Sequence, residues 1–183
     1  MRTLVGAVGY RNLRDHSAPF AIIDRLSSDD LGPDVVVEDT SYNPIAIVQW
    51  LEGETPENRF DRVVLVAAIE RSRAPGAITA YRWDGVLPPD EQVQQAVVEA
   101  VTGVIALENT VVIAGYFHVL PLAVAIVEIE PVDHAFGADF SPVVSAAIEP
   151  ACVLIRRLAR DPDVFGTLPV RPMPFRHAVR LQT

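Results

Sequence analysis

The sequence predicts an α/β fold, a three-layer αβα sandwich around a mostly parallel sheet of five strands. Two segments, residues 4–8 and 62–69, are apolar runs rich in β-branched residues, as are strands buried on both faces of a parallel sheet. Segments with helical signals alternate with such runs along the chain. This alternation requires right-handed crossovers that place helices on both faces of the sheet.

Three further segments complete the predicted sheet. Residues 34–38 (DVVVE) and 122–129 (LAVAIVEI) are dominated by β-branched and aliphatic side chains. Residues 77–83 (AITAYRW) follow the turn pair Pro75-Gly76, which is typical of a strand start.

The helical segments are marked by their first turns and by periodicity. Residues 19–26 and 44–51 each begin with a proline, and residues 90–101 combine an acidic first turn with apolar positions at helical spacing. Residues 110–119 suit either a helix or a strand. A last helix begins at Ser141-Pro142, and Pro150 predicts a break or kink before a second segment at 149–159, because an interior proline removes a hydrogen bond and clashes with the preceding turn.

The length of 183 residues and an apolar content of 50% predict one α/β domain over residues 1–160, followed by an irregular, proline-rich tail over residues 161–183. The single cysteine, Cys152, lies in an apolar run and has no partner for a disulfide. We interpret it as a small buried hydrophobic residue.

Net charge and hydropathy exclude several kinds of partner. The formal charge is −9 and the arginines are scattered, so we expect neither nucleic acid nor an anionic membrane as a partner. The first residues are too weakly apolar for a signal peptide, and no stretch of about 18 apolar residues exists. The sequence therefore predicts a soluble, cytoplasmic protein.

Ligands of an open parallel sheet bind beyond the carboxyl ends of the strands, so the loops there are the place to seek a site. The loop 9–17, after the first strand, contains Asp15 and His16, which together can bind a metal or transfer protons. Alternatively, Asp15 or Ser17 caps the following helix. Glu70 follows the third strand and is expected at the same edge.

Other motifs are incomplete. Gly6 and Gly9 lack the remainder of a nucleotide-binding fingerprint, so we interpret Gly9 as a tight-turn residue. His118, His134 and His177 have no histidine or cysteine at metal-ligand spacing and are interpreted as structural. No nucleophile elbow and no zinc-protease motif occurs, and the catalytic residues, if any, stay unknown.

Several segments nevertheless resemble one family. Residues 126–131 (IVEIEP), Phe136-Gly137 and residues 140–144 (FSPVV), followed by an alanine-rich helix, resemble the late strand, loop and helix of the hydrogenase maturation endopeptidases. Residues 8–26, residues 61–66 and Pro75-Gly76 resemble that family's first loop, third strand and following turn. The resemblance extends over about residues 3–160 and implies removal of a C-terminal tail from the large subunit of a nickel–iron hydrogenase.

The resemblance also implies how nickel in the substrate is recognised: by an acidic residue of the first loop, an aspartate ending the third strand and a histidine before a later helix. Matching the segments places His16, Ala67 and Gly103 at these three positions. A methyl group or a hydrogen cannot bind a metal, so two of the three ligands are lost. The resemblance implies a hydrogenase-like large subunit as partner, nickel in that substrate, and no certain cofactor of the chain itself.

Three hypotheses follow, and the sequence leaves open whether the protein is an enzyme. In the first, a divergent member of the family has lost cleavage, as a pseudoenzyme, and binds or assists maturation of a hydrogenase-like large subunit. In the second, it is an active endopeptidase with relocated polar groups. As a separate hypothesis, Asp15, His16 and Glu70 form a substitute metal site at the same edge, in which His16 binds metal. In the third, those residues serve as acid–base groups of a small-molecule enzyme in the switch-point crevice.

Overall fold

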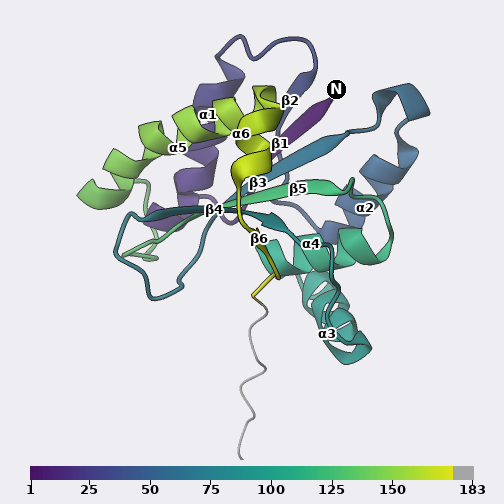
Figure 1. Ribbon diagram of the computed structural model, residues 1–183. Helices are drawn as coiled ribbons and strands as arrows, with labels where there is room; N and C mark the ends of the chain where they lie inside the picture. The colour runs from purple at the N-terminus through teal and green to yellow at the C-terminus, as the bar shows by residue number, and fades with distance from the viewer. Residues whose placement is uncertain (175–183) are drawn as a thin grey trace, which may run out of the picture.

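The computed structural model describes residues 1–174 and contains one mixed sheet (Figure 1). Its strand order is β2-β1-β3-β5-β4-β6. The bounds are β1 Thr3–Val8, β2 Val35–Asp39, β3 Arg62–Ala68, β4 Ile78–Trp83, β5 Ala123–Ile129 and β6 Val170–Arg171. The first five are the predicted strands, so the predicted α/β fold class is confirmed.

Most strand pairs are parallel. β1 runs parallel to β2 and β3, and β3 runs parallel to β5, with Val5 opposite Val64 and Val64 opposite Ala125. β4 is antiparallel to β5. The carboxyl ends of β1, β3 and β5 therefore meet at one edge of the sheet, and the loops that follow them lie side by side.

Helices cover both faces, as the alternating pattern predicts. Figure 1 shows α1 (Ala18–Ser27) and α5 (Pro142–Arg160) on one face, and α2 (Pro44–Gly53) and α4 (Leu107–Tyr116) on the other. α3 (Asp90–Val101) packs beside α4. Two short 3-10 helices, η1 (Arg14–Ser17) and η2 (Pro56–Asn58), precede α1 and β3. The segment 110–119, which suits helix or strand, is thus mostly helical.

Each face of the sheet has its own apolar core. Val5, Val64 and Val127 pack against α1 and α5, while Leu65 and Ile126 point to the opposite face and pack against α2 and α4. Cys152 is fully buried in the first core, which confirms its interpretation as a buried hydrophobic residue.

The predicted break at Pro150 is wrong, because α5 is continuous through it. Ala147, Ile148 and Ala151 are buried on the sheet side of the helix, whereas Pro150 lies on the exposed side. Packing of the apolar face before and after the proline offsets the cost of the missing hydrogen bond. Tertiary packing therefore outweighs the tendency of proline to break a helix.

The predicted irregular tail is also partly wrong. α6 (Pro162–Thr167) follows α5, and the Asp161 side chain caps it by accepting hydrogen bonds from the N–H groups of Asp163 and Val164. β6 then pairs in parallel with β4, so the sheet has six strands rather than five. Residues 175–183, including His177, lie outside the described residues. Within residues 1–174, no helix is both long and apolar enough to cross a membrane.

Candidate functional site

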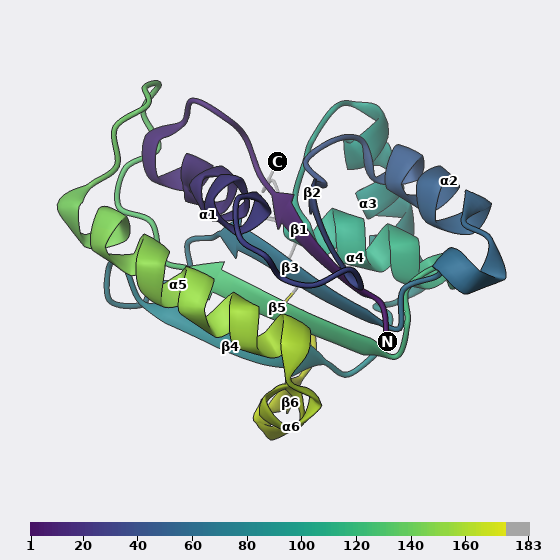
Figure 2. The ribbon, with the colours of Figure 1, turned by 90° about the horizontal axis from the view of Figure 1, so that it is seen from above.

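Two loops are joined at the carboxyl edge of the sheet: the loop after β1 and the loop after β5. Figure 2 shows them side by side at this edge, in purple and green. The Arg14 N–H donates to the Gly137 carbonyl at 3.0 Å, and the Gly137 N–H donates to the Asn12 carbonyl at 2.9 Å. An ion pair of 2.7 Å between Arg14 Nη1 and Asp133 Oδ2 adds a side-chain contact. The loops therefore form one connected unit.

Asp15 holds this unit together from inside. Its carboxylate is fully buried and accepts hydrogen bonds from the backbone N–H groups of Val132 (2.9 Å), Asp133 (3.0 Å) and Ser141 (2.7 Å). Burial opposes ionisation of Asp15, but these donors outweigh it and hold the pKa below its ordinary value. The lone pairs of Asp15 are thus directed at the loop backbone.

Neither Asp15 nor Ser17 caps α1 through its side chain, so that alternative is wrong. Ser17 occupies the N-cap position, but no side-chain capping bond forms. Instead, Ser17 Oγ accepts a hydrogen bond from the Leu13 N–H at 2.9 Å and donates to the Tyr10 carbonyl at 3.3 Å. These bonds stabilise a loop in which Asn12 and Arg14 have positive φ values of 63° and 40°, conformations that non-glycine residues rarely adopt.

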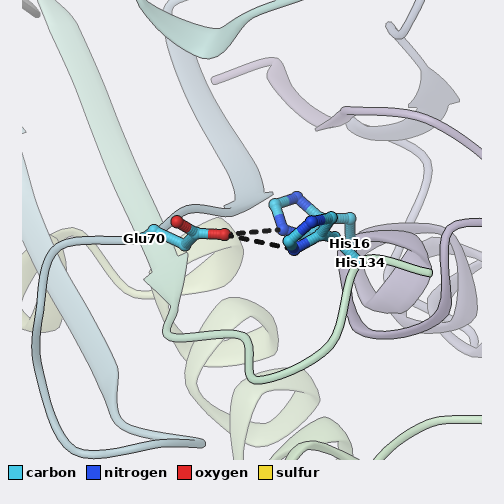
Figure 3. A group of neighbouring side chains, drawn as sticks. All are labelled: His16, Glu70 and His134. Carbon is cyan, nitrogen blue, oxygen red and sulfur yellow. Dashed lines mark ion pairs between the residues drawn. The ribbon is translucent and has the colours of Figure 1, made fainter.

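The structure brings His16 and Glu70 together and adds His134 (Figure 3). His16 Nε2 lies 3.7 Å from Glu70 Oε1, and His134 Nδ1 lies 3.6 Å from the same oxygen. The two imidazole rings are edge to face, with centroids 6.0 Å apart. One potential ligand atom from each residue lies within 4.8 Å of the other two. We call these three residues the His-Glu-His cluster.

The three members differ in exposure. The His16 side chain is 25% exposed, whereas those of Glu70 and His134 are 59% and 75% exposed. Burial lowers the pKa of His16, and the nearby Glu70 only partly counteracts it. His16 is therefore a neutral imidazole near pH 7, which is the form that binds metal ions. Sequence spacing alone missed His134, because its partners come from other loops.

The two other family positions offer no ligand atom in their side chains. Ala67 lies on β3, buried, opposite Val8 and Glu128 in the neighbouring strands. Gly103 follows α3, and its carbonyl accepts a hydrogen bond of 3.4 Å from the Tyr10 hydroxyl. That hydroxyl also accepts from the Ile105 N–H at 2.6 Å, so the turn at Gly103 is attached to the first loop.

A buried ionic network, which the sequence analysis did not single out, lies next to Ala67. Glu128 is fully buried on β5, where one carboxylate oxygen contacts Arg71 at 3.1 Å and the other contacts Arg73. The Tyr81 hydroxyl donates to Glu128 at 3.0 Å, and Arg71 also pairs with Glu108 at 2.7 Å. The sequence did contain a signal for this network: a glutamate within an apolar strand and two arginines just after another strand.

The network sets the protonation of its members. Burial opposes ionisation of Glu128, but hydrogen bonds from Arg73 and Arg71 outweigh it and lower its pKa. Burial and the adjacent Glu128 carboxylate raise the pKa of Tyr81. Glu128 is consequently an ionised, fully paired carboxylate at neutral pH.

His118 lies elsewhere. It lines a cavity of about 370 Å³ at the opposite, amino-terminal edge of the sheet, together with Phe60 and Leu120. It therefore does not belong to the His-Glu-His cluster. For this reason His118 can serve as a control histidine in experiments on that cluster.

The three-layer αβα domain is similar in fold to solved structures of hydrogenase maturation proteases. No protein-family model matches the chain, and no curated protein matches its sequence. Solved structures do. Hydrogenase maturating endopeptidase HybD from E. coli is similar with a TM-score of 0.62 and 22% identity, over 85% of this chain and 90% of that one.

Two archaeal structures give the same result. Hydrogenase 2 maturation peptidase from Thaumarchaeota archaeon SCGC_AB-539-E09 is similar with a TM-score of 0.58 and 24% identity, over 85% of this chain and 95% of that one. [NiFe] hydrogenase maturation protease HybD from Thermococcus kodakarensis has a TM-score of 0.59 and 17% identity, over 87% and 99%. The resemblance expected from the sequence motifs is confirmed at the level of the fold.

Proposed function

We propose that this chain is a divergent maturation factor that binds a nickel–iron hydrogenase-like large subunit at the carboxyl edge of its sheet and assists its maturation. The fold supports this proposal, because the similar solved structures are hydrogenase maturation endopeptidases. The observation that carries it is the convergence of His16, Glu70 and His134 from three loops at that edge. Imidazole and carboxylate groups are ligands that a nickel-loaded partner would encounter there.

The proposal includes a loss of cleavage by the family's usual means. Ala67 and Gly103 stand where the resemblance places an aspartate and a histidine, and neither side chain can donate to a metal. Tight contacts also surround Ala67, which is 2% exposed and packed beside the Glu128 network. Binding without cleavage is the outcome that these replacements favour.

One observation favours a second candidate, an active endopeptidase with a relocated site. The His-Glu-His cluster restores three potential ligands at the same edge, with His134 contributed by the loop after β5. If the cluster replaces the family ligands, tail removal would depend on Glu70 and His134. The two candidates therefore differ in a single measurable product.

The test uses the purified chain and the precursor of a hydrogenase large subunit from the same source, loaded with nickel. Complex formation is measured by size-exclusion chromatography, and tail removal by intact-mass spectrometry. We expect a complex with an uncleaved precursor. Tail removal that is lost in Glu70→Gln and His134→Ala but kept in His118→Ala would establish the second candidate instead.

Absence of any complex, with and without nickel, would contradict both candidates. It would favour the third hypothesis, a small-molecule enzyme that uses His16 and Glu70 as acid–base groups. A complex that forms equally well without nickel would keep the partner but exclude metal-dependent recognition.

A further inference from the structure

We propose that His16, Glu70 and His134 form a binding site for a divalent ion of the zinc or nickel type, which the isolated chain holds with part of the coordination sphere left open. This inference goes beyond the proposed function, because it requires no hydrogenase partner. It also differs from the ligand set implied by the family resemblance, since Glu70 and His134 lie outside the three family positions.

The distances within the His-Glu-His cluster fit a shared ion better than they fit direct bonds. The nitrogen–oxygen separations of 3.7 Å for His16 and 3.6 Å for His134 are too long for hydrogen bonds, which fall at about 2.7–3.2 Å. Ligand atoms at about 2.0–2.2 Å from one ion lie roughly 3 to 3.6 Å from each other. Small side-chain movements would therefore complete the site.

The burial pattern is suited to such an adjustment. His16 Nε2 is buried and has no hydrogen-bond partner among residues 1–174. Glu70 and His134 are largely exposed, so their side chains can rotate toward an ion without repacking the core. One fixed ligand and two adjustable ligands make a site that is accessible from solvent.

The backbone around the cluster is already held in place. Asp15 fixes the amides of Val132 and Asp133 immediately before His134, and hydrogen bonds from the neighbouring Arg14 join the same two loops. These hydrogen bonds hold the two loops together and thereby keep His16 near His134. Such preorganisation lowers the entropic cost of binding.

The ligand types restrict which ion would bind. Magnesium and calcium prefer oxygen ligands, whereas two imidazoles with one carboxylate suit zinc and nickel. Three protein ligands leave at least one position for water or for a group from another molecule, as in zinc sites that act on substrates. The open coordination position of the ion would accept a thiolate or carboxylate from another molecule, or a water.

The test measures metal binding by the untagged full chain after treatment with a chelator. Isothermal titration with Zn²⁺ and Ni²⁺ should show saturable binding with one ion per chain, and Mg²⁺ should show none. Co²⁺ should give visible absorption typical of nitrogen and oxygen ligands. We expect His134→Ala and Glu70→Gln each to weaken Zn²⁺ binding at least tenfold, while circular dichroism confirms that both variants are folded.

Two histidine variants serve as controls. His118→Ala, at the opposite edge, and His177→Ala, in the C-terminal segment, should bind Zn²⁺ as the unchanged chain does. Absence of saturable binding would overturn the proposal, as would binding that is unchanged in both His134→Ala and Glu70→Gln, or lost in either control. Each of these results can be obtained whether or not the chain forms a complex with a hydrogenase subunit.

Discussion

Asp15 and Ser141 are 126 positions apart, yet the Ser141 N–H donates a hydrogen bond of 2.7 Å to the Asp15 carboxylate. Ser141 is the N-cap of α5, so this bond joins the loop after β1 to the start of the longest helix. The Asp15 carboxylate also accepts hydrogen bonds from the backbone N–H groups of Val132 and Asp133. One buried carboxylate therefore determines the path of the loop that carries His134.

Replacing Asp15 with asparagine should therefore destabilise the protein. The amide offers one acceptor oxygen and directs an NH₂ group at backbone donors, so buried N–H groups are left unpaired. We expect Asp15→Asn to lower the free energy of unfolding by about 2 to 3 kcal/mol. Urea denaturation measures it. Asp24→Asn, at an exposed helix position, should stay within about 0.5 kcal/mol of the unchanged chain, and an equal loss in both variants would contradict the assignment.

The Glu128 network predicts a large effect of a single truncation. Glu128→Ala leaves Arg71 and Arg73 without their buried partner, and removal of one member of a buried ion pair costs about 3 to 5 kcal/mol. Guanidinium chloride denaturation at pH 7 measures the difference. A loss below about 1 kcal/mol would show that the two arginines find other partners.

The same network predicts how stability depends on pH. The folded pKa of Glu128 lies below its unfolded value of about 4.5, so its ionised form stabilises the fold above that pH, and the contribution is lost as the pH falls through the folded pKa. The difference in unfolding free energy between the unchanged chain and Glu128→Gln should be full at pH 6 and smaller at pH 3. A constant difference across this range would contradict the prediction.

Gly76 should tolerate no side chain. Its φ is +75°, and an added Cβ would lie 2.7 Å from the Val143 carbonyl oxygen in the first turn of α5. We expect Gly76→Ala to lower the midpoint of thermal unfolding, with a loss of about 2 kcal/mol or more. Gly53→Ala is the matched control, because Gly53 ends α2 with open space around it and alanine favours helix.

Pro150 predicts a stabilising substitution. It lies inside α5 on an exposed surface, where alanine would restore a helical hydrogen bond without disturbing the core. Pro150→Ala should raise the free energy of unfolding by about 1 to 3 kcal/mol. Pro142→Ala, at the first position of the helix, should change it little. If Pro150→Ala is neutral or destabilising, the helix has adapted to the proline in a way that alanine does not share.

The sequence predicted the central strands well, because their apolar runs are long and few alternatives bury them. β3 differs from the expected segment by one residue and β1 by one residue. The prediction of a break at Pro150 in the helix 142–160 was wrong, because it rested on local propensity and did not include the apolar face that packs on the sheet. α6 and β6 were missed because their few residues acquire structure only by contact with α5 and β4.

The candidate site was predicted in part. Its location followed from strand direction, which placed His16 and Glu70 at one edge. His134 could not be found by spacing, because it approaches through a loop-to-loop contact that only the tertiary structure creates. Asp15 was named as a site residue on its chemical type, yet its partners are backbone amides of a distant loop.

The two-residue strand β6 protects the outer strand of the sheet. Backbone hydrogen bonds connect Arg82 and Asp84 to Pro169 and Arg171, so part of the free edge of β4 is already occupied by the chain itself. An open strand edge is a template for pairing between molecules and promotes aggregation. Because β6 covers part of this edge, a chain shortened to residue 160 should precipitate at concentrations at which the full chain stays dispersed.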